Sequence, residues 1–250
     1  MDYSADAGLD RCRSYLVSQF KEETGKFSAP GPGPAVTVSY LTGAGEHEFA
    51  QRLAEILQAT ETQGLTKWTV LDRQLIERVL DEHFLPKEMA KFLPEDHRSF
   101  VEDEMGELLG LHPPAWVIVP HITETVLQFA KAGHAVLVGR GAGFITARLA
   151  HVFHVRLIAP LPDRIERVQK VENLSPKAAA KFIANKDRGR TRYSKAYFHG
   201  RAADDLLFHL VINTARIPLA DAAQLAAEQA RKCFLANSVG SQPTIERSSR

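Results

Sequence analysis

Short β-branched or apolar runs alternate with amphipathic helical segments from Ala35 onward, and this alternation limits the fold more than any other feature. The runs predicted to be strands are 36–41, 68–71, 135–138, 152–158 and 210–213. The segments predicted to be helices are 46–60, 73–82, 99–109, 116–132, 162–171, 176–197 and 220–234. Strands that alternate with helices form a parallel sheet with helices on both faces. The sequence therefore predicts a three-layer α/β fold with a central sheet of five parallel strands.

The two ends of the chain differ in character from this central part. Apolar residues within 9–20 have the spacing of one short amphipathic helix, and the Pro/Gly-rich stretch 28–34 follows as a linker. The segment after Asn237 is polar and rich in serine, which is typical of a disordered tail. We predict a leading helix and linker at 1–34, one domain at 35–236 and a tail at 237–250. The leading helix is expected to pack on its own domain or on a second subunit of a homodimer, and the sequence does not decide between them.

Composition excludes several classes of protein. The 250 residues carry a formal net charge of +1, whereas dedicated nucleic-acid binders usually have a strongly basic surface. The two cysteines are far apart, so we expect no disulfide scaffold and a reducing, cytoplasmic compartment. No signal peptide or membrane helix is expected, because no apolar run approaches about 20 residues. His151 and His154 straddle the start of a predicted strand, so no histidine metal site is predicted either.

A glycine bend follows the first predicted strand, and ligands of parallel sheets bind beyond the carboxyl ends of the strands. The bend reads Gly43-Ala44-Gly45-Glu46-His47. A bend of this kind between a strand and a helix presents backbone N–H groups to a phosphate. The P-loop pattern GxxxxGK[ST] has a lysine where Glu46 stands and a magnesium-binding hydroxyl where His47 stands. The alternative is a tight turn in which Glu46 complements the dipole of the following helix.

Three further places carry candidate binding residues. Asp72 follows the second strand and is predicted either to cap a helix or to bind an acceptor nucleotide. Arg140 follows the third strand among glycines, where its guanidinium is expected to bind phosphate. Arg188 and Arg192 lie in a cationic run and have the i, i+4 spacing of one helical stripe. That stripe is predicted to be either a solvated surface or a mobile lid that neutralises phosphates.

The order of these segments resembles the cytidylate kinase-like family. The segments that carry the resemblance are 36–57, 71–76, 136–143, 164–167, 186–193 and 211–214. The resemblance covers residues 36–234 and implies a P-loop fold with a helical lid. It also implies transfer of the ATP γ-phosphate to a nucleoside monophosphate such as CMP, with Mg²⁺. By the same resemblance Gly43 and Gly45 would cradle ATP, Asp72 and Arg140 would hold the acceptor, and Arg188 and Arg192 would be the lid arginines.

The loop departs from the family pattern Ser-Arg-x-x-Gly-Ser-Gly-Gly, because Glu46 stands at its last glycine. Three hypotheses for function follow. The first is a nucleoside monophosphate kinase, and the second is a catalytically weakened nucleotide-binding protein that serves as a sensor or partner-binding module. The third is a structural or assembly protein. The first two require the bend near Ala44, Arg140 and the cationic run around Arg190 to converge on one anion-binding cleft.

Overall fold

The protein is seen in a computed structural model, which describes residues 32–61, 67–72, 115–139, 141–198 and 205–240. The predicted helices at 9–20, 73–82 and 99–109 lie outside these ranges, as do most of the linker and most of the tail. The described ranges contain five strands, six α-helices and one 3-10 turn.

A five-stranded parallel sheet forms the centre of the molecule, as predicted. Its strands are β1 (Ala35–Tyr40), β2 (Thr69–Leu71), β3 (Ala135–Val138), β4 (Val152–Ile158) and β5 (Leu210–Asn213). The spatial order is β2-β3-β1-β4-β5, so β1 is the middle strand and pairs with both β3 and β4. From β1 the chain crosses to the edge strand β2, returns through β3 and then passes β1 to reach β4 and β5, so the connections that leave the neighbouring strands β1 and β3 run in opposite directions. In sheets of this kind the crevice at the carboxyl ends of such strands is the usual ligand site.

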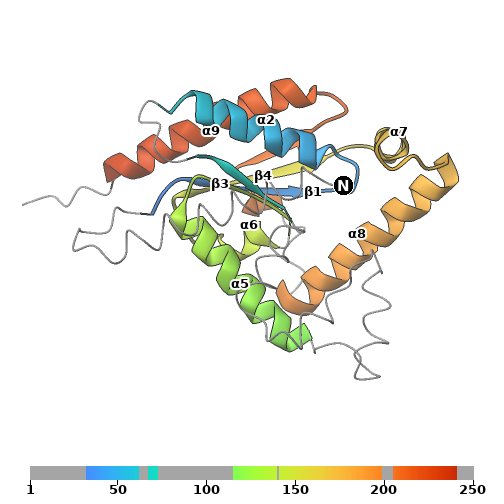
Figure 1. The fold of residues 1–250 in the computed structure, drawn as a ribbon, viewed down its shortest axis with the longest axis horizontal. Helices are drawn as coiled ribbons and strands as arrows, with labels where there is room; N and C mark the ends of the chain where they lie inside the picture. The colour runs from blue at the N-terminus through green and yellow to red at the C-terminus, as the bar shows by residue number, and fades with distance from the viewer. Residues whose placement is uncertain (1–31, 62–66, 73–114, 140, 199–204, 241–250) are drawn as a thin grey trace, which may run out of the picture.

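Helices cover both faces of the sheet (Figure 1). They are α2 (Glu46–Ala59), α5 (Ala115–Ala132), α6 (Ala142–Ile145), α7 (Leu161–Glu172), α8 (Pro176–Phe198) and α9 (Leu219–Gly240), with a 3-10 turn η3 (Asp205–Leu207). In Figure 1, α2 and α9 lie side by side over one face, and α5 and α6 lie on the other. Helices α7 and α8 lie at the end of the sheet where β1 leads into α2. They therefore border the predicted binding crevice.

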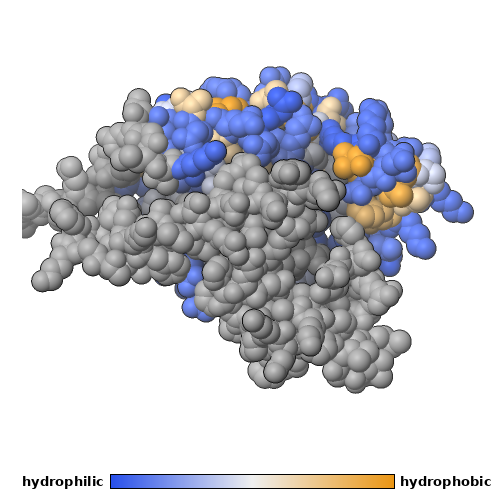
Figure 2. Space-filling model, in the orientation of Figure 1, coloured by the Kyte–Doolittle hydropathy of each residue, from blue (hydrophilic) through white to orange (hydrophobic). Residues whose placement is uncertain are grey.

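The alternation of side chains along the strands builds two cores, one on each face. On one face Val36 and Val38 pack beneath α2, which contributes Phe49 and Leu53 at helical spacing. On the other face Leu137 packs with residues of α5 and α6. The outer surface over α2 and α9 is largely hydrophilic in Figure 2, as expected for helices that bury one side only. The fold is thus held by a sheet buried on both faces.

The carboxyl-terminal helix is longer than predicted. Helix α9 continues to Gly240, whereas the sequence predicted an end at Phe234 and a tail from 237. The boundary placed at 236 therefore falls inside a helix. The physical reason is that residues 235–239 contain no glycine or proline, so nothing in the chain stops the helix before Gly240.

Two stacked histidines, of which His154 is buried, give this fold a predicted sensitivity to acid. The Nδ1 of His154 lies 2.7 Å from the Thr37 hydroxyl, and the His154 backbone N–H donates to Nδ1 of His209 at 3.0 Å. The two rings stack with their centroids 5.2 Å apart. Burial, aided by the neighbouring His209, lowers the pKa of His154 to about 4, and burial also lowers the pKa of His209. Burial therefore favours the neutral form of both side chains in the folded protein.

We expect the free energy of unfolding to fall by about 2 kcal/mol as the pH drops from about 6.5 to about 4. The unfolded chain takes up protons on these histidines below about pH 6.5, whereas the folded chain does so only near the lowered pKa. Urea unfolding at several pH values measures this slope. The variant His154→Gln should flatten this slope, and the exposed His47→Gln is the control variant. An equal slope in wild type and His154→Gln would contradict the assignment.

Candidate functional site

The bend between β1 and α2 has the backbone conformation that its glycines predict. Gly43 has φ 81° and Gly45 has φ 92°, values in the left-handed region that favours glycine. The Ala44 N–H donates to the Leu41 carbonyl at 2.9 Å, and the Gly45 carbonyl accepts the first α2 hydrogen bond, from Phe49, at 3.0 Å. The bend therefore lies at the N-terminus of α2, at the carboxyl end of the middle strand.

Oxygen atoms of the chain itself already occupy the backbone N–H groups of this bend. Gly45 N–H donates to Oε2 of Glu46 at 3.1 Å, and Thr42 N–H donates to Oδ1 of Asp187 at 3.0 Å. The Ala44 N–H is used by the turn described above. The expectation that the bend presents free N–H groups to a ligand is therefore wrong for these three residues. A phosphate reaches the amides of Thr42 and Gly45 only if it displaces a carboxylate.

Glu46 turns back into the bend instead of pointing into solvent. Glu46 as a whole is 9% exposed, and burial raises the pKa of its carboxyl group. The backbone N–H groups of Glu46 and Gly45 and the charge of Arg190 act in the opposite direction and lower that pKa. The Glu46 carboxyl group thus accepts from a backbone N–H of the bend itself.

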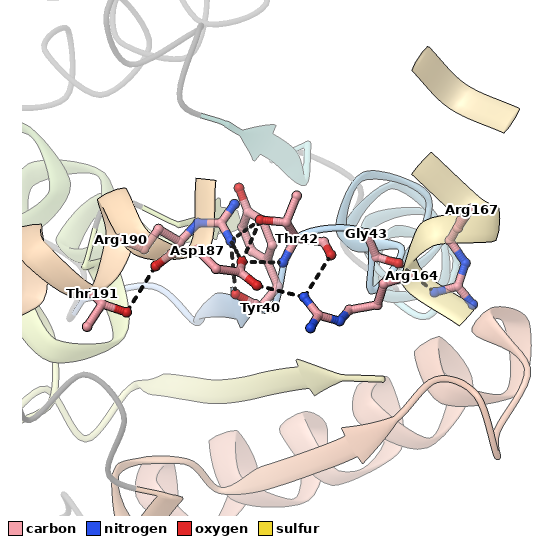
Figure 3. Close-up of polar contacts among 8 residues, drawn as sticks. All are labelled: Tyr40, Thr42, Gly43, Arg164, Arg167, Asp187, Arg190 and Thr191. Carbon is pink, nitrogen blue, oxygen red and sulfur yellow. Dashed lines mark hydrogen bonds and ion pairs between the residues drawn. The ribbon is translucent and has the colours of Figure 1, made fainter. Parts of the chain in front are cut away.

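A second carboxylate, that of Asp187 on α8, is bound by four donors at the same bend (Figure 3). Its Oδ1 accepts from the Thr42 backbone N–H at 3.0 Å, from the Thr42 hydroxyl at 2.6 Å and from Arg190 at 3.2 Å. Its Oδ2 accepts from Arg164 of α7 at 2.7 Å. The Arg190 guanidinium also lies 4.0 Å from the centre of the Tyr40 ring, a cation–π contact. These contacts join α7 and α8 to the loop after β1.

A third set of contacts is made to the backbone carbonyl groups of the bend. Arg167 of α7 donates to the Gly43 carbonyl at 2.9 Å and to the Thr214 carbonyl at 3.3 Å. The Thr214 hydroxyl, directly after β5, donates to the Ala44 carbonyl at 2.8 Å. Charge-assisted and buried hydrogen bonds of this kind fix a loop more firmly than solvent-exposed ones. The side chains of Arg167 and Thr214 therefore hold the bend in its observed conformation.

Asp72 and His47 lie at the edge of the site. The Oδ2 of Asp72 is 4.0 Å from Nδ1 of His47, and the two side chains are 32% and 70% exposed. The residue predicted to bind the acceptor is thus next to the first turn of α2. Among the described residues, no group of three His, Cys, Asp or Glu side chains could hold a metal ion.

The structure brings most of the predicted site residues together and separates two of them from the rest. The residues at the bend are Gly43, Ala44, Gly45, Glu46 and His47. Arg188 and Arg192 are exposed on α8, and the residues of α8 that reach the bend are Asp187 and Arg190. Residues three apart share a helix face, and that face is the one turned toward the loop. Arg140 lies outside the described residues.

Sequence reasoning did not single out Thr42, Arg164, Arg167, Asp187 or Thr214 as site residues. A signal existed for the two arginines of α7, because their i, i+3 spacing puts both guanidinium groups on one side of a helix that follows a parallel strand. No comparable signal marked Thr214, whose role depends on how close the end of β5 comes to the bend.

A model of the cytidylate kinase-like family matches residues 35–216, which include β1, the bend, α7, α8 and Thr214. The chain belongs to this family. The resemblance inferred from the sequence is therefore confirmed, and the five-stranded sheet flanked by helices is the P-loop kinase fold of the family.

Individual relatives agree with this membership to different extents. The cytidylate kinase of Pyrococcus horikoshii is 27% identical over 183 residues, which are 72% of this chain and 80% of that kinase. The uronate isomerase of Corynebacterium glutamicum is 32% identical over 106 residues, or 42% of this chain, but the match spans only 20% of that protein. The crystal structure of an uncharacterized protein from Eubacterium ventriosum superimposes with a TM-score of 0.56 at 16% identity, covering 81% of this chain and 98% of that one. The last match shows a shared fold.

Of the helices that the structure describes, none combines the length and the apolar character needed to cross a bilayer.

Proposed function

We propose that this chain is a kinase that transfers the γ-phosphoryl group of ATP to a nucleoside monophosphate of the CMP type. One observation carries the proposal. The Thr42 backbone N–H, the Thr42 hydroxyl and the guanidinium groups of Arg164 and Arg190 converge on a single carboxylate at the end of the middle strand. Donors of these kinds bind phosphate oxygens. Membership in the cytidylate kinase-like family supports the same reading.

In the proposed reaction the arginines supply the positive charge that phosphoryl transfer requires. There is little covalent chemistry for a protein to perform in this reaction, and catalysis depends on positioning and on stabilising the developing charge. Arg164 and Arg190 would neutralise the phosphates of ATP. Asp72 and Arg140 would hold the acceptor nucleotide, and Arg188 and Arg192 would close over the site with α8.

The described residues fit ATP better than they fit magnesium. The four donors around Asp187 match phosphate oxygens, although a carboxylate occupies them here. Mg²⁺ prefers oxygen ligands, and His47 stands where P-loop kinases have the hydroxyl that binds the metal. We therefore assign no catalytic step to a metal held by this loop.

A second candidate function is nucleotide binding without efficient transfer, as in a sensor or partner-binding module. The position of Glu46 favours it, because a buried carboxylate inside the bend opposes the approach of phosphate. The two candidates make the same prediction for nucleotide binding and differ in turnover.

We expect purified protein to convert CMP to CDP at the expense of ATP, as measured by a coupled assay or by chromatography. Arg140→Ala should nearly abolish this activity, and Arg190→Gln should lower kcat by about 100-fold because it removes transition-state charge stabilisation. The exposed Lys195→Gln on the same helix is the matched control and should retain activity.

Two other outcomes, from the activity assay combined with melting temperatures measured with and without nucleotide, would contradict the kinase proposal. If no nucleoside monophosphate is phosphorylated but ATP raises the melting temperature, the protein binds nucleotide without transferring phosphate. If no nucleotide raises the melting temperature, the site does not bind nucleotides and the chain has a structural or assembly role.

A further inference from the structure

We propose that the Asp187 carboxylate occupies a phosphate position of this site, and that a phosphate group of the bound nucleotide displaces it. Asp187 would then be an internal competitor that sets the affinity of the loop for phosphate. The inference deepens the proposed function and rests on it for the identity of the ligand, which is the phosphate chain of a nucleotide.

The first argument is the arrangement of the donors. Both oxygens of the Asp187 carboxylate are used, with three donors on Oδ1 and one on Oδ2, all within 3.2 Å. Two of these donors come from Thr42 in the loop, and the others are Arg164 and Arg190 from two different helices (Figure 3). The Asp187 side chain is 26% exposed, so water can solvate its carboxylate. The four protein donors are therefore more than its solvation requires. The same donors suit the oxygens of a phosphate, which accepts more hydrogen bonds than a carboxylate does.

The second argument is the balance of charge. Two guanidinium groups face the single carboxylate of Asp187, which leaves one positive charge uncompensated within this group of side chains. The nearby carboxylate of Glu46 accepts from the Gly45 backbone N–H and forms no ion pair with either guanidinium among the described residues. A phosphate dianion in place of the carboxylate would match the two arginines. The site is thus more cationic than its present occupant requires.

The third argument concerns Arg164. Its side chain is only 11% exposed, and its Nε–H has no hydrogen-bond acceptor among the residues that the structure describes. A buried donor without an acceptor is costly, and in native proteins it often marks a position that a ligand or water completes. Arg164 therefore has bonding capacity that Asp187 does not use.

The test is a calorimetric titration of the full chain with inorganic pyrophosphate, the simplest mimic of adjacent nucleotide phosphates. Asp187→Asn removes the charge while keeping the shape, and we expect it to bind pyrophosphate roughly tenfold more tightly than wild type. Glu166→Gln is the matched control, because it removes the same charge from an exposed residue of the neighbouring helix α7. It should bind like wild type. Adding Arg164→Gln to Asp187→Asn should remove the gain.

Several results would overturn the inference. Folded Asp187→Asn that binds pyrophosphate no more tightly than wild type would make Asp187 a purely structural residue. If Glu166→Gln tightens pyrophosphate binding by the same factor, the effect comes from the overall charge of the protein and not from the position of Asp187. If Asp187→Asn does not fold, a crystal structure of wild type with pyrophosphate decides. Phosphate oxygens on Thr42, Arg164 and Arg190 with Asp187 turned away would support the inference, and an unmoved Asp187 would refute it.

This experiment is separate from the test of the kinase proposal, because pyrophosphate binding requires no phosphoryl transfer. If Asp187→Asn binds pyrophosphate more tightly but the wild type shows no turnover, the anion site is supported and the kinase proposal is contradicted. If the wild type is an active kinase but Asp187→Asn does not change pyrophosphate affinity, the kinase proposal is supported and the role of Asp187 is contradicted.

Discussion

Replacing Gly43 with alanine is expected to lower the free energy of unfolding by about 3 kcal/mol. Gly43 has φ 81°, where any other L-residue is strained by about 1–2 kcal/mol. An added Cβ would also lie 2.8 Å from the Arg164 carbonyl oxygen and 2.8 Å from a Val168 methyl group. The carbonyl belongs to the backbone of α7 and has little freedom to move, so the loop itself must shift. Phosphate binding should be lost along with this stability.

Gly139→Ala is the matched control for this prediction. Gly139 has φ 78°, nearly the same as Gly43, but its added Cβ would lie no closer than 3.4 Å to the Tyr40 ring. The control therefore measures the backbone strain alone, and we expect it to cost about 1–2 kcal/mol. Urea unfolding followed by circular dichroism gives both values. Equal losses in the two variants would show that the bend does not pack closely against α7.

Replacing Glu46 with glycine is expected to tighten ATP binding by about 100-fold. Two like charges about 4 Å apart repel by about 4 kcal/mol at an effective dielectric constant of 20, and each 1.4 kcal/mol is about tenfold in affinity. The wild-type side chain relieves part of this repulsion by taking up a proton, since burial raises its pKa, or by rotating away. The expected gain is therefore smaller than the full repulsion would give. Isothermal titration calorimetry at pH 7 to 8 measures it.

Two further substitutions separate charge from shape in the Glu46 experiment. Glu46→Gln keeps the side chain in the bend but removes its charge, so it should show most of the gain. Glu48→Gln removes a carboxylate that is 55% exposed and paired with Arg52 on the outside of α2. It should leave ATP affinity unchanged. An unchanged affinity in both Glu46 variants would mean that this carboxylate does not face the phosphates of bound ATP.

The sheet could be predicted from sequence because its strands are short runs, mostly β-branched or apolar, with sharp boundaries. The run 135–138 lies between glycines at 133 and 139, and the observed β3 has the predicted bounds. The strands β4 and β5 also have their predicted bounds. A short apolar run of this kind is typical of a central parallel strand, because such a strand is buried on both faces of the sheet. Helix ends were harder to place, as α9 shows, because the local signal that stops a helix there is weak.

The site could be predicted only in part, because its decisive contacts depend on how helices are rotated and packed. The sequence identified the bend and the cationic run of α8, and the structure brings these two together. It did not identify which face of α8 meets the loop, since the packing of Val168 on α7 against Ala179 and Ile183 on α8 sets that rotation. Nor could it decide whether Glu46 points outward or inward. Both directions satisfy the helix dipole, and the Gly45 N–H selects the inward one.

The most direct test of the account is a calorimetric titration of the full chain with ATP in the presence of magnesium. Saturable binding is expected, and Arg190→Gln should weaken it about tenfold because a guanidinium is removed from the donors at the bend. If wild type binds no ATP at millimolar concentration, and no nucleotide raises its melting temperature, the convergence of donors around Thr42 is not a nucleotide site.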